Sequence, residues 1–127
     1  MRLFLVRHAE AAPGEPDELR PLTDAGKATA RTLGEHLAAH APGTVICSPL
    51  LRARETADAI ARAAGIDADV DERLAPGATL ETLREAAEGR DAPIVAVGHQ
   101  PDCSEIYAEV TGDDRGFAPG DAAELEL

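Results

Sequence analysis

The sequence contains very few aromatic residues: it has no Trp, one Tyr and two Phe. The core of a chain that is 44% hydrophobic must therefore be built mainly from Leu, Val, Ile and Ala side chains. Because aromatic rings are the usual platforms on which single-stranded nucleic acids stack, their scarcity argues against such a binding surface.

Basic residues are also scarce, since 12 Lys and Arg stand against 24 Asp and Glu, for a net charge of −12. A protein with this charge repels phosphodiester backbones and anionic lipid surfaces. We therefore expect neither a nucleic acid nor a membrane as a partner.

Long apolar runs are absent. The amino-terminal stretch MRLFLV is too short for the apolar region of a secretory signal, and no later run approaches membrane-spanning length. Cys47 and Cys103 fall in different expected elements, which is weak evidence for an oxidising compartment. We expect a cytoplasmic protein with two free thiols, and its 127 residues fit one domain, residues 1–127.

Short runs of branched residues predict buried strands at Leu3–Val6, Val45–Cys47 and Ile94–Val97. Helical periodicity and capping residues occupy the stretches between them. Helices are expected at Asp24–His40, Leu51–Ala64, Thr79–Glu88 and Asp102–Val110, and weaker strands at Ala68–Asp71 and Glu124–Leu127. This alternation predicts an α/β protein, a three-layer α/β/α sandwich with a mostly parallel central sheet.

Basic and imidazole side chains gather where the expected strands end. Arg7 and His8 follow the first strand, Arg52 begins the helix after the second, and His99 follows the strand before the last helix. Ligands bind beyond the carboxyl ends of the strands in such sheets. Because clustering these groups costs electrostatic and desolvation energy unless an anion is bound, a phosphoryl group is the simplest expected ligand.

Each residue type suits phosphoryl transfer. Arginine forks donate several hydrogen bonds to phosphoryl oxygens and stabilise the charge of the transferring group. A histidine with one unprotonated ring nitrogen is a nucleophile, and neighbouring Arg7 and Arg52 favour a neutral His8 because like charges lower its pKa. A backbone carbonyl would be a suitable acceptor to fix its tautomer.

The segments RHAEA, SPLLRARETA and VGHQPD, in this order, resemble the histidine phosphatase superfamily. The RPLTDAG segment, Arg20–Gly26, and the short length resemble its SixA-like phosphohistidine phosphatases. The resemblance implies a phosphoglycerate mutase-like fold and no metal or other cofactor. It also implies that His8 is transiently phosphorylated, that Arg7, Arg52 and His99 hold the phosphoryl oxygens, and that water regenerates His8. Arg20 is a candidate substrate-binding residue at the rim.

The sequence departs from the family pattern at two points. Ala9 stands where the family usually has Gly, which adds a methyl group next to the nucleophile. The inserted region from which larger relatives supply a general acid is missing, and Glu10, Asp17 and Glu18 are the remaining acid candidates. Because helices, strands and turns fill the segment between Arg52 and His99, no lid fits there.

An open site suits a phosphohistidine displayed on a protein, since a protonated imidazole leaves readily without strong acid catalysis. Two alternatives stay open at this point. A small phosphomonoester would be handled by the same chemistry. A non-catalytic module that binds phosphate or a phosphoprotein would explain the missing acid, although it has less need of a nucleophilic histidine.

Other motifs favour structural roles. Cys47 is separated from Arg52 by four residues, where a cysteine phosphatase loop needs five. Cys103 lies near a helix start, where a thiol pKa can fall, but packing is the better explanation. His36 and His40 have zinc-ligand spacing without a third ligand, and the acidic stretch Ile66–Leu74 lacks the glycine and terminal acid of a calcium loop.

Overall fold

The computed structural model describes residues 1–127 and has an alternating order of strands and helices. The strands are β1 (Arg2–Arg7), β2 (Thr44–Cys47), β3 (Ala68–Val70), β4 (Ile94–Gly98) and β5 (Ala122–Glu126). The α-helices are α1 (Asp24–Ala38), α2 (Leu51–Ala64), α3 (Leu80–Ala87) and α4 (Asp102–Thr111), with short 3-10 helices η1 (Asp17–Leu19) and η2 (Glu72–Leu74).

The five strands form one sheet in the order β3-β2-β4-β1-β5. β1 to β4 run parallel to one another, and β5 runs antiparallel beside β1 at the edge. The expected mostly parallel sheet is confirmed, as is an edge strand near the carboxyl terminus. That edge strand begins at Ala122, two residues before the expected start, because its pairing with β1 extends further than its polar-apolar alternation indicates.

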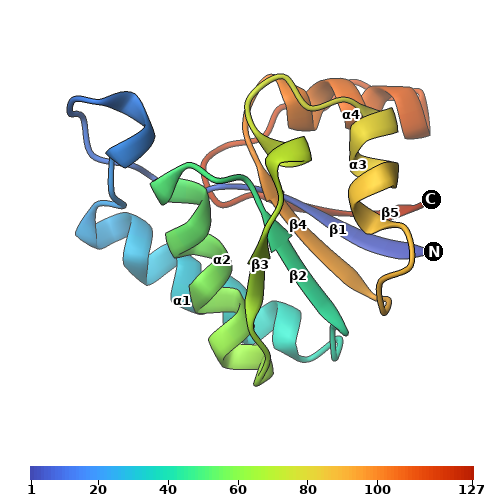
Figure 1. Cartoon of the computed structure of the whole chain (residues 1–127), viewed down its shortest axis with the longest axis horizontal. Helices are drawn as coiled ribbons and strands as arrows, with labels where there is room; N and C mark the ends of the chain where they lie inside the picture. Colours follow the sequence, from blue (N-terminus) through green and yellow to red (C-terminus); the bar gives the residue numbers. More distant parts are fainter.

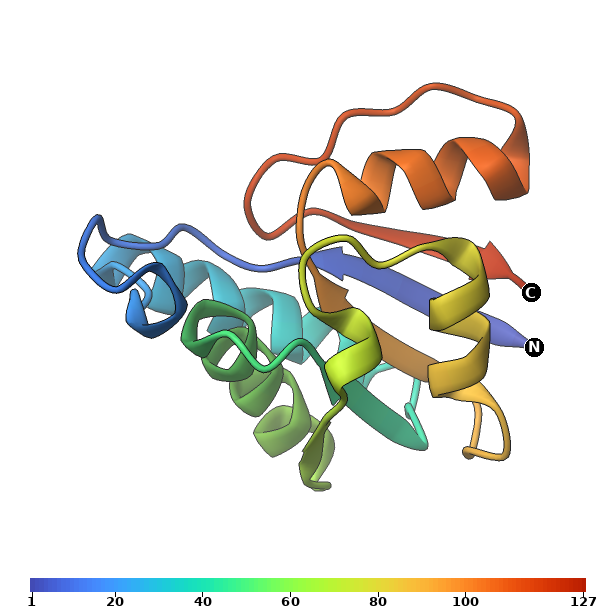
Figure 2. The same ribbon diagram turned by 45° about the horizontal axis from the view of Figure 1, so that its top comes forward.

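Helices cover both faces of the sheet (Figures 1 and 2), as expected for a three-layer sandwich. Alternation along β1 divides its side chains between the faces. Phe4 and Val6 pack with residues of α1 and α2, whereas Leu3 and Leu5 pack with residues of α3 and α4. These two aliphatic clusters form the core, since Phe4 and Phe117 are its only buried aromatic side chains apart from histidine.

Local signals in the sequence fix the helix ends. Thr23 caps α1 by accepting the N–H of Gly26, and Gly65 ends α2 with a left-handed backbone, φ 75°. Gly26 is needed for a second reason, because a Cβ atom there would lie 2.1 Å from the carbonyl oxygen of Glu10. The glycine therefore lets α1 lie directly against the segment that follows His8.

No helix has the length and apolar character needed to cross a membrane. The cytoplasmic location expected from the sequence stays a prediction. The amino group of Met1 donates a hydrogen bond to the carbonyl oxygen of Leu127, so both chain ends lie at the same side of the sheet (Figure 1). Arg7 and His8, two of the residues predicted to bind phosphate, lie at the opposite end of β1.

Candidate active site

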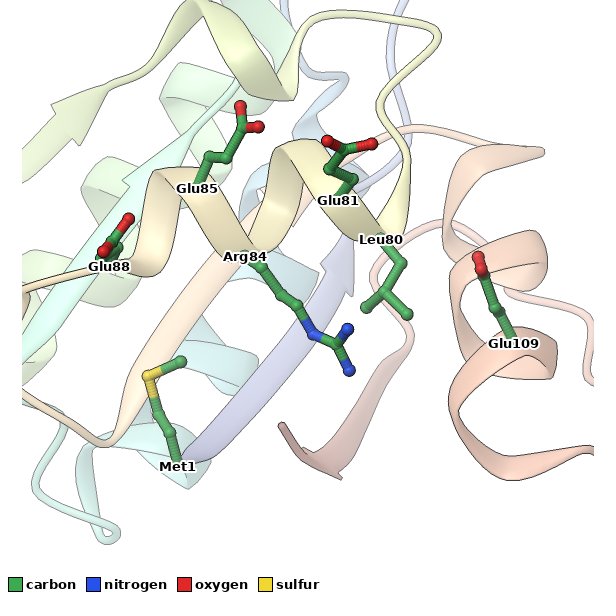
Figure 3. A pocket seen from close by; sticks show the side chains of 7 residues that line it. All are labelled: Met1, Leu80, Glu81, Arg84, Glu85, Glu88 and Glu109. Carbon is green, nitrogen blue, oxygen red and sulfur yellow. The ribbon is translucent and has the colours of Figure 1, made fainter.

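Two hollows in the surface differ sharply in charge. One, of about 450 Å³, lies between α3 and α4 and is lined by Met1, Leu80, Arg84 and four glutamates, Glu81, Glu85, Glu88 and Glu109 (Figure 3). Its carboxylates repel a phosphoryl group. A smaller hollow of about 230 Å³ lies at the carboxyl end of the sheet. Its charge makes the smaller hollow the candidate active site.

All five side chains predicted from the sequence line this smaller hollow. They are Arg7, His8, Arg20, Arg52 and His99, and Pro76 and Gln100 complete the lining. Neither of the last two was singled out from the sequence. Gln100 lies within the VGHQPD segment. Pro76 lies in the loop between η2 and α3, whose sequence indicates a turn but not a place in the site.

The register of the parallel strands brings the histidines together. Arg7 pairs with Gly98, and the N–H of His8 then donates to the carbonyl oxygen of Gly98. The next residue along each strand is a histidine, and the two imidazole centroids lie 5.3 Å apart. β4 also pairs with β2 on its other side, which places Ser48 beside His99.

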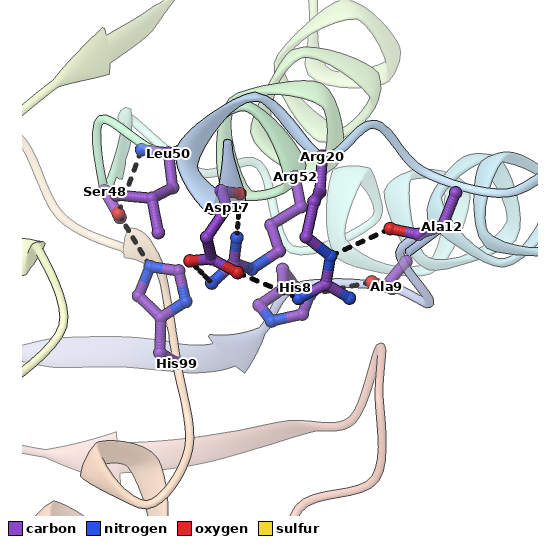
Figure 4. Close-up of polar contacts among 9 residues, drawn as sticks. All are labelled: His8, Ala9, Ala12, Asp17, Arg20, Ser48, Leu50, Arg52 and His99. Atoms are coloured by element: carbon purple, nitrogen blue, oxygen red, sulfur yellow. Dashed lines mark hydrogen bonds and ion pairs between the residues drawn. The ribbon is translucent and has the colours of Figure 1, made fainter. Parts of the chain in front are cut away.

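His8 is held in one tautomer. Its Nδ1 atom lies 2.8 Å from the carbonyl oxygen of Ala9 (Figure 4). Because a carbonyl oxygen only accepts, Nδ1 carries the hydrogen, and the Nε2 atom of a neutral ring keeps its lone pair. Burial is the main cause that lowers the pKa of His8, followed by the charges of Arg52 and Arg7, against the opposing effect of the Ala9 hydrogen bond.

His99 is also neutral at pH 7, since burial and the neighbouring His8 and Arg52 lower its pKa to about 4. Its Nε2 atom lies 2.7 Å from Oγ of the fully buried Ser48. Ser48 Oγ accepts the N–H of Leu50, so its own hydrogen is available to Nε2. The second ring nitrogen of His99 faces the side on which Arg52 lies (Figure 4).

The arginines are oriented by contacts that the sequence did not predict. Arg52 donates from Nη1 to the backbone oxygen of Asp17, 2.9 Å away, and from Nη2 to the Asp17 carboxylate, 3.2 Å away. Arg7 donates from Nη1 to the carbonyl oxygen of Phe117, 2.8 Å away, while its buried Nε has no partner. An unpaired buried donor is costly, so this nitrogen is a point of strain in the folded site.

Arg20 spans the loop at the rim. Its Nε donates to the carbonyl oxygen of Ala12 at 2.8 Å, and its Nη1 donates to the Asp17 carboxylate at 3.1 Å. The guanidinium is thereby fixed at the mouth of the hollow, where the RPLTDAG segment was expected to bring it.

Two buried side chains outside the predicted set support the site. Thr56 accepts the N–H of Ala9 and donates to the carbonyl oxygen of Arg52, which links the segment after His8 to α2. Asp102 accepts the N–H groups of Gly77 and Ala78 and so holds the loop that carries Pro76. Thr56 lies in the RETA portion and Asp102 in the HQPD portion of the quoted motifs. Their closeness in sequence to Arg52 and His99 was the one feature that could have identified them as part of the site.

The departures from the family pattern have structural explanations. Ala9 is fully buried and packs with Leu22 and Ala30, so its extra methyl group fills the core and leaves the hollow open. Among the acid candidates, Glu10 accepts a hydrogen bond from the Thr23 hydroxyl, whereas Asp17 contacts the pocket arginines. Asp17 is thus an acid candidate with direct contacts to two arginines of the hollow, but the hydrogen bond from Arg20 lowers its pKa, which disfavours proton donation at neutral pH.

The two thiols have the properties of core residues. Cys47 and Cys103 are buried, and burial raises the pKa of each to about 12. The helix start therefore does not lower the pKa of Cys103, because desolvation outweighs any effect of the helix. A thiol with such a pKa is not a nucleophile at neutral pH.

The other polar motifs also have structural partners. His40 contacts Arg2, with Nδ1 and Nη2 2.8 Å apart, and its ring lies beside Phe4. Asp71, in the acidic stretch, caps η2 and forms ion pairs with Arg73 and Arg90. These contacts give His40 and Asp71 structural roles.

Comparisons with known proteins identify the family of this chain. Residues 3–76 match the model of the histidine phosphatase superfamily, branch 1. A protein of Picosynechococcus sp. of uncharacterized function is 39% identical over 116 residues, which cover 83% of this chain and 70% of the relative.

Two solved structures are similar over nearly the whole chain. A structure from Agrobacterium tumefaciens assigned to SixA phosphohistidine phosphatases is 31% identical, with a TM-score of 0.82 over 98% of this chain and 90% of the other. The protein histidine phosphatase SixA complexed with tungstate is 25% identical, with a TM-score of 0.87 over 100% of this chain and 88% of the other. The chain belongs to the histidine phosphatase superfamily, and its fold is that of the SixA structures.

Proposed function

We propose that this phosphatase dephosphorylates phosphohistidine on a protein, with His8 as its nucleophile. Nε2 of His8 attacks phosphorus, the bond from phosphorus to the substrate imidazole breaks, and the imidazole leaves with a proton from solvent. Water then attacks the phosphorus of phospho-His8. The bond between phosphorus and Nε2 breaks, the water oxygen remains on the released phosphate, its protons go to the phosphate or to solvent, and His8 regains its free nitrogen.

The observation that carries this proposal is the hydrogen bond between Nδ1 of His8 and the Ala9 carbonyl. It leaves Nε2 as the free nitrogen of a ring whose pKa is lowered. A neutral imidazole with one fixed lone pair is already prepared for attack, so no separate base has to remove a proton first.

Four further side chains have proposed roles around the phosphoryl group, and a fifth, Ser48, orients one of them. Arg7 and Arg52 would donate hydrogen bonds to its oxygens, and Arg20 would bind substrate at the rim. Ser48 would keep Nε2 of His99 occupied, so that Nδ1–H of His99 donates to a phosphoryl oxygen. Together these donors stabilise the charge that develops on the transferring group, which is the main part of phosphoryl-transfer catalysis.

The shape of the site supports a protein substrate. The segment between Arg52 and His99 is taken up by α2, β3, η2, α3 and β4, and Pro76, in the loop before α3, is its one residue that lines the hollow. A phosphoimidazole projecting from another protein would have access to such a site. The similarity to SixA phosphohistidine phosphatases supports the same substrate class, and a SixA structure holds tungstate, an oxyanion like phosphate.

A time course of phosphate release tests the proposal. The substrates are a protein that carries phosphohistidine and the small ester p-nitrophenyl phosphate, each supplied with a chelator present. We expect faster release from phosphohistidine, loss of release in His8→Ala, and no effect of the chelator. His36→Ala is the matched control, because His36 is an exposed histidine near the end of α1 and does not line the hollow.

Each other outcome has a definite meaning. Faster release from the ester would identify a small-molecule phosphomonoesterase. Full activity in His8→Ala would exclude His8 as the nucleophile. Phosphate binding without release from either substrate would favour a binding module.

A further inference from the structure

Two arginines of the candidate active site already have an anionic partner, the side chain of Asp17. Its two carboxylate oxygens accept hydrogen bonds from different arginines, Oδ1 from Arg20 at 3.1 Å and Oδ2 from Arg52 at 3.2 Å (Figure 4). These are two of the three arginines that line the hollow. A phosphoryl group that enters the hollow has to share them with Asp17.

The net positive charge of the side chains at the site balances the negative charge of one phosphoryl group only if Asp17 is included in the sum. The hydrogen bonds from Arg20 and Arg52 lower the pKa of the Asp17 carboxyl, so it is ionised at neutral pH. Both histidines are neutral. Three arginines and one carboxylate leave two positive charges, which equal the charge of a phosphoryl dianion. Without Asp17 the hollow would have an excess positive charge.

The exposed Asp17 carboxylate can change the affinity of the site for phosphate without displacing Arg52, because Arg52 is buried and has a second partner. The side chain of Asp17 is 61% exposed, whereas that of Arg52 is 9% exposed and is also held by the Asp17 backbone oxygen. Removal of the carboxylate charge therefore leaves Arg52 with a backbone partner. The carboxylate adjusts the charge at the mouth, while the backbone contact keeps the arginine in place.

We propose that Asp17 is a specificity-determining residue that limits how tightly the site holds oxyanions. Its carboxylate shares Arg20 and Arg52 with the bound phosphoryl group, which favours departure of inorganic phosphate. The negative charge of Asp17 also repels ligands that carry a second anionic group beside the phosphoryl group. It does not repel a leaving imidazole, which becomes neutral or positively charged when it gains a proton. This inference rests on the proposed function for the location of the phosphoryl group.

Binding of inorganic phosphate, measured by isothermal titration calorimetry at low ionic strength, tests the inference without turnover. We expect Asp17→Asn to bind phosphate about fivefold more tightly than the wild type, and Asp17→Ala to shift affinity in the same direction. The difference should shrink as salt is added. Glu15→Gln is the matched control, because it removes the same charge from an exposed residue of the same loop that makes no contact with the arginines.

A second arm examines ligand selection with phenyl phosphate and 4-carboxyphenyl phosphate. Asp17→Asn should improve binding of the carboxylated compound more than binding of phenyl phosphate. Phosphate affinity that is unchanged or weaker in both Asp17 variants, with melting temperatures near that of the wild type, would overturn the inference. These measurements record binding and not turnover. A failure to hydrolyse phosphohistidine would therefore contradict the proposed function, while the effect of Asp17 on phosphate affinity could still be determined.

Discussion

The hydroxyl group of Thr56 accepts the N–H of Ala9 at 3.0 Å, one residue after the proposed nucleophile. The same hydroxyl donates to the carbonyl oxygen of Arg52 at 2.8 Å. Thr56 is completely buried and thus joins the strand end that carries His8 to the helix that carries Arg52. One side chain thus connects the segment after the proposed nucleophile to the first turn of α2, which carries Arg52.

Replacement of this hydroxyl should impair catalysis as well as stability. Thr56→Val keeps the shape but leaves the Ala9 N–H unpaired, at a cost of about 1 to 3 kcal/mol in the free energy of unfolding. Because Ala9 fixes the His8 ring, we expect kcat to fall more than KM rises. Thr56→Ser keeps the hydroxyl, so its kcat should stay close to that of the wild type and above that of Thr56→Val. Equal kcat in the Val and Ser variants at a temperature where both are folded would show that Thr56 is only structural.

We expect the pKa of His8, the proposed nucleophile, to set the acid limit of activity. Burial and the arginine charges hold it below its ordinary value of 6.5, so His8 stays neutral and nucleophilic at pH 7. As pH falls through the folded-state pKa of His8, the ring gains a proton and the rate should decline. An NMR titration of the His8 Cε1 proton, assigned by comparison with His8→Gln, measures this directly. A midpoint at or above 6.5 would contradict the electrostatic account of the site.

Neutral His99 should make stability depend on pH. The unfolded ring binds a proton near pH 6.5, whereas the folded ring does so only near pH 4. Between these values the unfolded state holds more protons, so stability is full above pH 6.5 and is lost as pH falls toward 4. The loss is on the order of 3 kcal/mol for this one group.

Urea unfolding of the wild type and His99→Gln at several pH values measures that contribution. Because glutamine does not titrate, the variant should lose less stability than the wild type between pH 6.5 and 4. Parallel pH curves for the two proteins would mean that His99 is not held neutral by the fold.

The residue pattern was sufficient to predict the sheet, its helices and the clustering of charged groups. Leu3–Val6, Val45–Cys47 and Ile94–Val97 are short branched runs, and each is a central strand. Their parallel alignment brings the following residues to one edge, so the position of Arg7, His8 and His99 follows from strand ends alone.

Other features depend on contacts that leave no pattern in the chain. The helix η1 has three residues, too few for periodicity, yet it brings Asp17 to Arg52 and Arg20. The burial that dominates the pKa of His8 arises from packing of distant segments. Ser48 and Thr56 lie within the quoted motifs, but their hydrogen-bond partners are known only once α2 is placed against the sheet.

The central claim is that His8 forms the phosphorylated intermediate. Brief reaction with a ³²P-labelled phosphohistidine protein, an alkaline quench that preserves phosphohistidine, and peptide mapping would locate the label. The account predicts phosphate on Nε2 of His8 in the wild type and in His36→Ala, and none in His8→Ala. Label on any other residue, or phosphate release by His8→Ala at the wild-type rate, would contradict it.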